Sequence, residues 1–245
     1  MYKGMFIAVA GAKNAQLRLD TSANNLANVE TVGFKRDRVL FESYLAEEGE
    51  KLSFDSTFPV AAKTISDYSE GPFKSRSDNL SVAIKGSGFF ELQASDQRKY
   101  TKDGAFKVSS DGYLVSSDDM PLLSKHDSPI FIGNLNAKIN NKGEVWLTER
   151  DHDSDKEILA GTIKIVDFPK PYTLSKAGNN LYSSDVEGSI LPTANLESSH
   201  VEMSNVNAVQ EMVDLIENSR SFESIMKLIT EHDSMTGKVA EQVIG

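Results

Sequence analysis

The chain has no cysteine among its 245 residues. Neither a disulfide framework nor a thiolate metal site can therefore form. Basic residues are in the minority, since 26 Lys and Arg stand against 36 Asp and Glu, for a net charge of -10. Nucleic acids and anionic membranes are bound through clustered positive charge, so this balance argues against both as partners. No apolar run approaches the roughly twenty residues of a membrane span, so we expect no membrane insertion.

Groups that could form a catalytic or metal site are also scarce. The four histidines lie far apart, and none has a second His at the spacing of a zinc site. Ser224–Lys227 matches the S-x-x-K motif of acyl enzymes, but the companion motifs are missing. Gly86–Gly88 lacks the third glycine of a dinucleotide-binding loop. We therefore predict no enzymatic activity, no catalytic residue, no metal and no cofactor.

The first part of the chain carries a helical pattern in which mostly apolar residues recur at alternating spacings of three and four. This is the a/d repeat of a coiled coil, which needs a partner. We predict a helix from about residue 3 to 28. Its strip consists of Tyr2, Met5, Val9, Ala12, Gln16, Leu19, Ala23 and Leu26. The apolar run Met5–Ala12 is short for a secretory signal, and the repeat continues past it, so we expect no cleavage.

The sequence marks the end of this helix with a turn. Asparagine is a poor helix former because its short amide competes for backbone hydrogen bonds, and three asparagines lie in the last turn or just beyond it. Gly33 then offers a position for a positive φ angle. The predicted turn motif consists of Asn24, Asn25, Asn28, Thr31, Gly33 and Phe34.

The middle of the chain has a different pattern. A basic cluster leads into a short amphipathic or extended segment that ends near residue 45, and the acidic stretch 46–57 reads as a linker. From 58 to 200, short apolar stretches alternate with turn signals such as Asp103-Gly104, which predicts a β-rich domain. Turns at intervals of about eight to twelve residues favour a sandwich or a partly closed barrel.

A second long helical pattern begins near Met203 and continues almost to the end, with Ser204 or Asn205 as its cap. It is apolar on two faces, so it needs more than one neighbour. One stripe consists of Val206, Val209, Val213 and Ile216. The other consists of Met212, Leu215, Phe222, Met226, Ile229 and Val243.

Together these patterns predict an α+β fold, in which long terminal helices pair as a coiled-coil-like layer beside a central all-β domain. The expected boundaries are 1–45 for the first helix and turn, 46–57 for the linker, 58–200 for the β-rich domain and 201–245 for the last helix. The first 40 residues carry a net charge of +3 and the residues from 197 onward carry -6, which favours pairing of the ends.

The pattern alone leaves two functions open. An a/d strip is usually the core of an intramolecular helical hairpin, and N-N-L-A-N can be no more than a helix stop. The chain could then be a monomeric binding module, with a β domain that recognises a peptide or glycan and a helical stalk. Alternatively, the second stripe of the last helix is covered by another molecule, and the chain is an assembly subunit.

Three stretches resemble one family, the flagellar rod and hook proteins of bacteria. Their positions follow the order of the family's amino-terminal, central and carboxy-terminal signatures: Ser22–Lys35, Gly86–Val115 and Val201–Asn207. The stretch N-S-R-S-F-E-S-I-M-K-L-I at 218–229 is most like proximal rod subunits, whereas G-F-K-R-D-R-V-L-F-E at 33–42 is closer to distal ones. The subtype therefore stays open.

This resemblance implies a structural subunit of the basal-body rod, which transmits torque and encloses the export channel. Its terminal helices would form the inner layer of an axial tube and its β domain the outer layer. The implied partners are other rod and axial proteins, further copies of the chain and the flagellar type III export apparatus. It also implies export as an unfolded chain without a cleaved signal, and assembly in the periplasm.

Assembly of this kind would act through the terminal helices, because a lone helix gains little stability from propensity and needs neighbours to bury its stripes. We therefore predict assembly contacts on both helices. They are Met5, Val9, Ala12, Leu19, Leu26, Val206, Val209, Val213, Ile216, Phe222, Met226 and Ile229.

Overall fold

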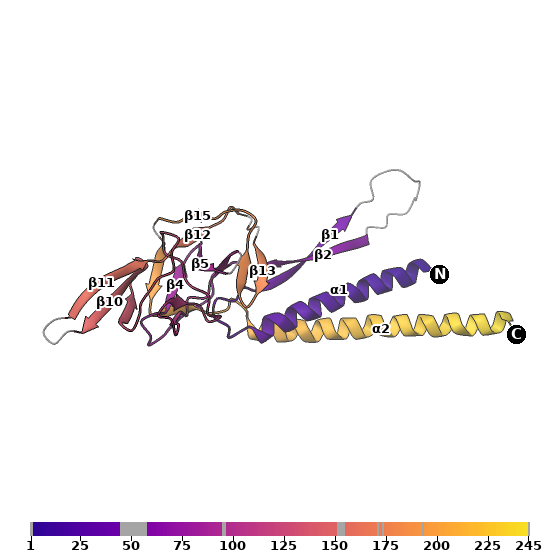
Figure 1. Cartoon of the computed structure of the whole chain (residues 1–245). Helices are drawn as coiled ribbons and strands as arrows, with labels where there is room; N and C mark the ends of the chain where they lie inside the picture. The colour runs from indigo at the N-terminus through magenta and orange to yellow at the C-terminus, as the bar shows by residue number, and fades with distance from the viewer. Residues whose placement is uncertain are drawn as a thin grey trace. The chain divides into compact units, whose positions relative to one another are not determined.

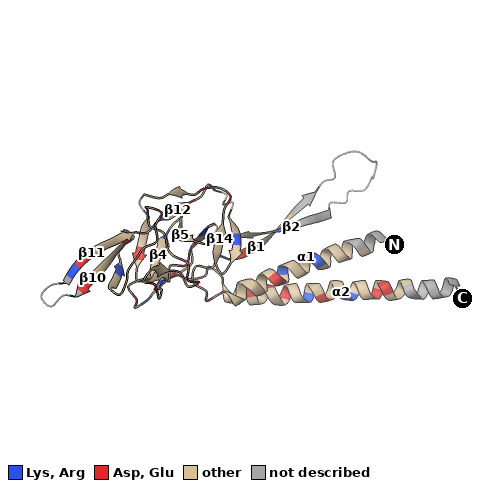
Figure 2. Cartoon of the chain, viewed as in Figure 1, with Lys and Arg blue, Asp and Glu red and all other residues tan. Residues whose placement is uncertain are grey.

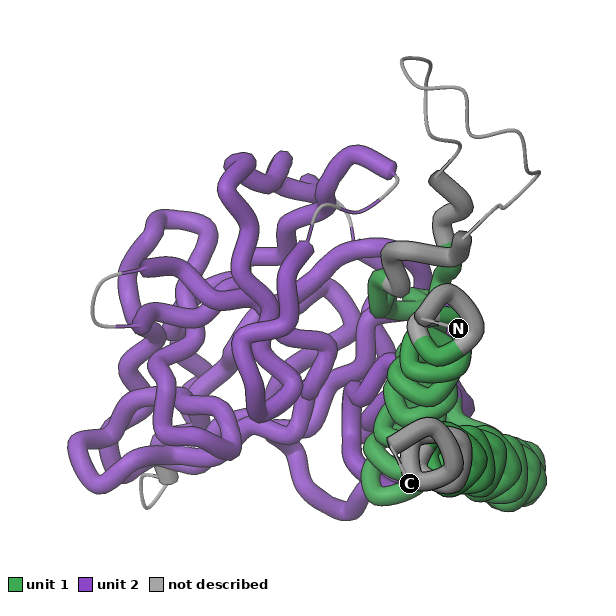
Figure 3. Tube along the Cα trace, turned by 90° about the vertical axis from the view of Figure 1, so that its right-hand side faces the viewer, with its two compact units in different colours: residues 1–29, 36–68, 206–245 green, residues 30–35, 69–205 purple. Residues whose placement is uncertain are grey.

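A computed structural model describes residues 2–44, 58–94, 97–150, 155–170, 172, 174–192 and 194–244 (Figure 1). The chain divides into two compact units (Figure 3). Unit 1 draws on residues 1–29, 36–68 and 206–245, and unit 2 on residues 30–35 and 69–205. The fold is α+β, with a helix at each end and a β-rich centre, as the sequence predicts.

Unit 1 contains the helices α1 (Tyr2–Ala27) and α2 (Ala208–Ile244) and the strands β1 (Asp37–Tyr44) and β2 (Phe58–Ser66). The two strands pair antiparallel, with a register shift between Glu42 and Ser43. The sequence grouped residues 58–66 with the β-rich domain, whereas their pairing with β1 puts them in unit 1. The expected linker 46–57 lies outside the described residues.

The start of α2 differs from the expectation. The helix begins at Ala208 rather than near residue 203, and its cap is Asn207 rather than Ser204 or Asn205. The side-chain oxygen of Asn207 accepts hydrogen bonds from the backbone N–H groups of Val209 at 3.1 Å and Gln210 at 3.2 Å. The physical reason is that residues 200–202 pair as a strand with residues 73–75, which holds the chain extended just before the helix.

Unit 2 is built from short antiparallel strands. Their bounds are β3 (Phe73–Ser75), β4 (Val82–Lys85), β5 (Phe89–Gln93), β6 (Arg98–Thr101), β7 (Lys107–Val108), β8 (Leu114–Val115), β9 (Asn136–Ile139), β10 (Glu144–Arg150), β11 (Asp155–Thr162), β12 (Ile165–Asp167), β13 (Ser175–Gly178), β14 (Leu181–Ser183), β15 (Ser189–Ile190), β16 (Asn195–Ser198) and β17 (His200–Glu202). Six of them form a sheet in the order β13-β14-β6-β5-β12-β15, and three form a sheet in the order β11-β10-β9. The remaining strands pair as β16-β4, β17-β3 and β7-β8, and the strands described here close into no barrel.

One apolar cluster forms the core of unit 2. Phe90 and Leu92 of β5, Ile139 of β9 and Val145 of β10 are fully enclosed in it. The side chains come from different sheets, so their burial holds those sheets together. The strands β4 and β5, which flank Gly86–Gly88, are therefore core strands of this unit.

Candidate assembly surfaces of the terminal helices

Within unit 1, α1 and α2 lie side by side (Figure 1). Each helix carries a strip of side chains that are less exposed than their neighbours, and we call the two strips together the seam. Its members are buried or half-buried and recur at spacings of three and four on both helices. On α1 they are Met5, Ala8, Ala12, Ala15, Leu19, Ser22 and Leu26, and on α2 they are Glu211, Leu215, Asn218, Phe222, Ile225, Ile229 and His232. A heptad spacing is therefore present on both helices.

The seam differs from the predicted strip at every second position. Met5, Ala12, Leu19 and Leu26 lie in it, as the spacing predicts. Val9, Gln16 and Ala23 do not: Val9 is 51% exposed, and the seam passes through Ala8, Ala15 and Ser22 instead. Small side chains allow close approach of the helices, and Gly11 is an example, because a Cβ atom there would lie 3.8 Å from Ile225 Cδ1. The apolar surface of Val9 favours position 9 in the sequence pattern, whereas the half-buried residue is Ala8; Val9 stays a predicted assembly contact. The side chains of Tyr2 and Val243 lie outside the described part of the chain.

A row of exposed apolar side chains occupies the opposite face of α2. We call Val209, Met212, Val213 and Ile216 the outer stripe, and they are between 45% and 68% exposed. Val209 and Val213 are each two residues from Glu211 in the seam, which is about 200° around an α-helix. The contact with α1 therefore leaves the outer stripe uncovered.

The other predicted assembly residues of α2 lie elsewhere. Val206 precedes the helix and is buried, and Phe222 and Ile229 lie in the seam. Met226 is 39% exposed and lies beside the seam residue Ile225. Charged residues of both signs follow the outer stripe along α2 (Figure 2). Among the α2 side chains that the structure describes, the exposed apolar surface is thus concentrated in the first three turns, with Leu228 and Met235 further along.

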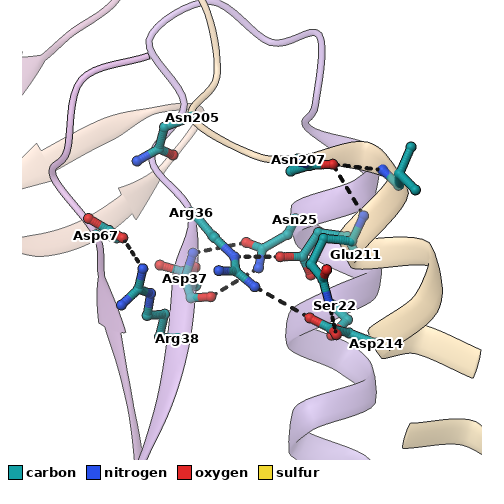
Figure 4. Close-up of polar contacts among 12 residues, drawn as sticks. Ser22, Asn25, Arg36, Asp37, Arg38, Asp67, Asn205, Asn207, Glu211 and Asp214 are labelled. Carbon is teal, nitrogen blue, oxygen red and sulfur yellow. Dashed lines mark hydrogen bonds and ion pairs between the residues drawn. The ribbon is translucent and has the colours of Figure 1, made fainter. Parts of the chain in front are cut away.

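The seam has a polar end, which lies at the C-terminal end of α1 and the N-terminal end of α2. Asn25 is 1% exposed, and its side chain makes two hydrogen bonds with the backbone of Asp37: Nδ2 donates to the carbonyl at 2.9 Å, and Oδ1 accepts from the N–H at 2.9 Å (Figure 4). Arg36 Nε donates to Oε1 of Glu211 at 2.5 Å. Asn218 Nδ2 donates to Ser22 Oγ at 3.4 Å. These bonds fix how α1, β1 and α2 meet, because each buried polar group needs its partner.

The predicted turn motif does occupy the end of α1 and the turn beyond it. Asn28 Nδ2 donates to the carbonyl of Asn24 at 2.9 Å, and the N–H of Phe34 donates to the carbonyl of Thr31 at 3.4 Å. Gly33 has a φ of 70°, the left-handed region that favours glycine. The ring of Phe34 is buried beneath Lys176 Nζ, 4.4 Å from its centroid. The motif is thus a turn, and its role in assembly stays a prediction.

The residue after Phe34 forms an ion pair that the sequence did not reveal. In unit 2, Lys35 Nζ lies 2.5 Å from Oε1 of Glu202, and both side chains are fully buried. Lys35 also donates to the carbonyl of Ser69 at 2.7 Å, and Glu202 Oε1 accepts from the N–H of Gly71 at 2.9 Å. No local pattern marks this pair, because its members are 167 residues apart. We call Lys35 and Glu202 the buried pair.

Lys102 provides a second cation next to the buried pair. Its Nζ lies 3.9 Å from Oε2 of Glu202 and donates to the carbonyl of Gly86 at 2.8 Å. Burial lowers the pKa of Lys102 to about 8, although the charge of Glu202 acts in the opposite direction. The folded protein therefore holds this ammonium less readily than the unfolded chain does.

This shift predicts a pH dependence of stability. Between pH 8 and 10.5 the unfolded chain binds more protons at Lys102 than the folded chain, so the free energy of unfolding should rise with pH across this window. The expected rise is about 3 kcal/mol, because each pKa unit corresponds to about 1.4 kcal/mol. Urea unfolding of the native chain and of Lys102→Met at several pH values checks it. The difference between the two profiles isolates Lys102, and parallel profiles would contradict the prediction.

At the polar end of the seam, α1, β1 and the start of α2 form a cleft of about 320 Å³. Its lining includes Arg18 and Thr21 of α1, Val39 and Phe41 of β1, and Glu211 and Asn218 of α2. The guanidinium of Arg18 lies over the Phe41 ring, 4.4 Å from its centroid. We call this surface the Arg18 cleft.

Two of the three arginines that line the Arg18 cleft form ion pairs with described residues, and Arg18 does not. Arg36 pairs with Glu211 and with Asp214, and Arg38 NH2 lies 2.6 Å from Asp67 Oδ2. Arg18 forms no ion pair with any described residue. The cleft therefore presents one positive charge, held in place by an aromatic ring, that has no counter-ion in the described part of unit 1.

Groups of metal ligands and membrane-spanning helices are also absent from the described residues. Among the described residues, no group of three or more His, Asp or Glu side chains could hold a metal ion. Within the same residues, no helix has the length and apolar character needed to cross a membrane.

Three family models match the chain, in the same order as the stretches identified in the sequence. They are Flagella basal body rod protein at residues 5–35, Flagellar hook protein FlgE/F/G D1 domain at residues 83–147, and Flagellar basal body rod FlgEFG protein C-terminal at residues 197–242. The first spans α1 and the turn, and the third spans most of α2. The residues of the seam and of the outer stripe thus fall within matched segments.

Curated proteins are similar over nearly their whole length. Flagellar basal-body rod protein FlgG of Buchnera aphidicola subsp. Schizaphis graminum (strain Sg) is 30% identical over 263 residues, which cover 98% of this chain and 100% of that protein. FlgG of Bacillus subtilis (strain 168) is 29% identical, with 96% and 97% covered. FlgF of Caulobacter vibrioides (strain ATCC 19089 / CIP 103742 / CB 15) is 27% identical, with 99% and 98% covered. Rod proteins of both names are therefore similar to this chain.

Proposed function

Because the chain belongs to the flagellar basal-body rod protein family, and so is a structural subunit of the rod, we propose that its terminal helices join neighbouring subunits into the axial tube. The tube transmits torque and encloses the export channel. The outer stripe carries this proposal, because four large apolar side chains on consecutive turns are exposed in the isolated chain. A contiguous exposed apolar row is typical of a surface that another molecule covers.

We also propose that the seam packs as a short coiled coil within each subunit. The heptad spacing on both helices and the small residues of α1 support this packing. Pairing within the subunit then uses one face of α2 and leaves the outer stripe for a neighbour. A heterologous contact that is repeated with a helical offset extends into an open tube rather than a closed ring.

The family places the chain in the flagellar basal body, where its partners are other rod proteins and further copies. We propose further that it assembles in the periplasm after export, without a cleaved signal, through the flagellar type III apparatus. A monomeric binding module is not favoured, because the curated relatives are rod proteins over nearly the whole chain. The family is structural rather than enzymatic.

Val213→Asp tests the proposed assembly. A carboxylate in the outer stripe should block the contact with a neighbour, because burial of an unpaired charge is strongly unfavourable. We expect loss of motility in the parent bacterium and absence of the protein from purified basal bodies. Ser221→Asp is the matched control, since Ser221 is an exposed α2 residue outside the stripe and should leave both readouts unchanged. Normal motility and incorporation of Val213→Asp would refute assembly through α2.

A further inference from the structure

The Arg18 cleft is a surface of unit 1 separate from the outer stripe. We propose that it is the counterpart of the outer stripe: the stripe of a second copy of this chain lies against the cleft, and Glu217 of that copy pairs with Arg18. This inference rests on the proposed assembly and names the surface that receives α2.

Charge complementarity supports a contact between the outer stripe and the Arg18 cleft. Glu217 follows Ile216 directly on α2, is exposed and forms no ion pair with any described residue. Arg18 also lacks a carboxylate partner among the described residues, and its guanidinium is held over Phe41. The chain thus presents one unpaired anion beside the stripe and one unpaired cation in the cleft. A desolvated pair of this kind gives an interface orientation and specificity.

The apolar part of the cleft lining also supports this contact. Val39 and Phe41 of β1 are half-buried and form an apolar wall next to Arg18. The outer stripe offers Val213 and Ile216 beside Glu217, so each surface places apolar groups next to a charge, which is negative at the stripe and positive in the cleft. The volume of about 320 Å³ is suited to a few side chains rather than to a whole helix. We therefore expect one or two turns of α2 to dock there.

The positions of the cleft and the outer stripe around α2 indicate how two copies would bind. Glu211 and Asn218 line the cleft, and each lies two residues from a member of the outer stripe, Val213 and Ile216 respectively. Two residues correspond to about 200° around the helix, so cleft and stripe are on nearly opposite faces of α2. A molecule that offers complementary patches on opposite faces binds head to tail. Such a contact leaves a free stripe and a free cleft at the two ends, and growth continues.

The absence of cysteine allows a direct test by disulfide cross-linking. Two differently tagged full-length copies are expressed together in the parent bacterium, one with Thr21→Cys in the cleft and the other with Ile216→Cys in the stripe. Each copy carries a single thiol, so every disulfide joins two molecules. Oxidation of purified basal bodies should yield a dimer that carries both tags. Replacing Ile216→Cys by Ser221→Cys, outside the stripe, should abolish it. Basal bodies that contain both copies but yield no mixed dimer would overturn the proposal.

Charge exchange provides an independent measurement. Arg18→Glu and Glu217→Arg should each reduce the number of assembled basal bodies about tenfold, because each places like charges opposite one another. The double variant should restore most of the loss, and circular dichroism of the purified chains should show unchanged helix content. If both single variants assemble normally while Val213→Asp does not, the cleft is not the partner surface, and the proposed function stands. If Val213→Asp also assembles normally, the proposed function itself fails.

Discussion

Replacing Glu202 by Gln is expected to lower the free energy of unfolding of unit 2 by about 3 to 5 kcal/mol. The substitution keeps the size and shape of the side chain but removes its charge. Lys35 then remains fully buried without a counter-ion, and Lys102 loses the carboxylate that lies 3.9 Å from its ammonium. An uncompensated buried charge is among the most destabilising changes that a single substitution can make.

Trp146, the single tryptophan of the chain, lies on β10 in unit 2, so its fluorescence during urea unfolding reports on that unit alone. Lys35→Met provides a graded comparison: it should destabilise less than Glu202→Gln, because Lys102 remains near the carboxylate. The triple variant Lys35→Met, Lys102→Met, Glu202→Leu should recover part of the loss, since it removes all three buried charges. A loss of less than about 1 kcal/mol for Glu202→Gln would show that the buried pair contributes little to stability.

Gly33→Ala is expected to destabilise unit 2 by at least about 2 kcal/mol. About 1 to 2 kcal/mol of this is the cost of holding a residue that has a Cβ atom in the left-handed backbone conformation. The remainder comes from a clash. A Cβ atom on Gly33 would lie 2.4 Å from the backbone nitrogen of Asp103 and 2.7 Å from the carbonyl carbon of Lys102. Both are main-chain atoms, so they cannot move aside as the end of a side chain can.

Gly178→Ala separates these two causes. Gly178 has a φ of 87°, also in the left-handed region, but no atom lies within 4 Å of where its Cβ would be. Its substitution should show the backbone effect alone, and Trp146 fluorescence reports on both variants in the same unit. Equal losses for the two variants would mean that the segment at Asp103 moves to accept the methyl group, contrary to the prediction.

The first helix could be predicted from its own residues. The bounds of α1, Tyr2–Ala27, agree with the expected 3 to 28 because both the heptad spacing and the asparagines that end the helix are local signals. The phase of the seam could not be predicted in full. Ala8, Ala15 and Ser22 have little apolar surface, so they give a weak signal, and it is contact with α2 that selects them over Val9.

The start of α2 and the buried pair depend on contacts between distant parts of the chain. The helical pattern extends towards residue 203, but the pairing of β17 with β3 overrides it and delays the helix until Ala208. Similarly, Lys35 reads as one of several basic residues before β1, and only the fold brings it to Glu202. The Arg18 cleft is of the same kind, since its lining comes from three elements that are far apart in sequence.

The buried pair also sets an order of events in folding. Its two members close a loop of 167 residues, so the contact cannot form until most of the chain is free to fold. An amino-terminal fragment that ends before Glu202 contains Lys35 without its counter-ion and lacks β17, the partner of β3. Contacts of such high sequence separation form slowly, because the entropy of closing the loop is lost before the contact is gained. Unit 2 therefore commits to its native state only when the chain is nearly complete.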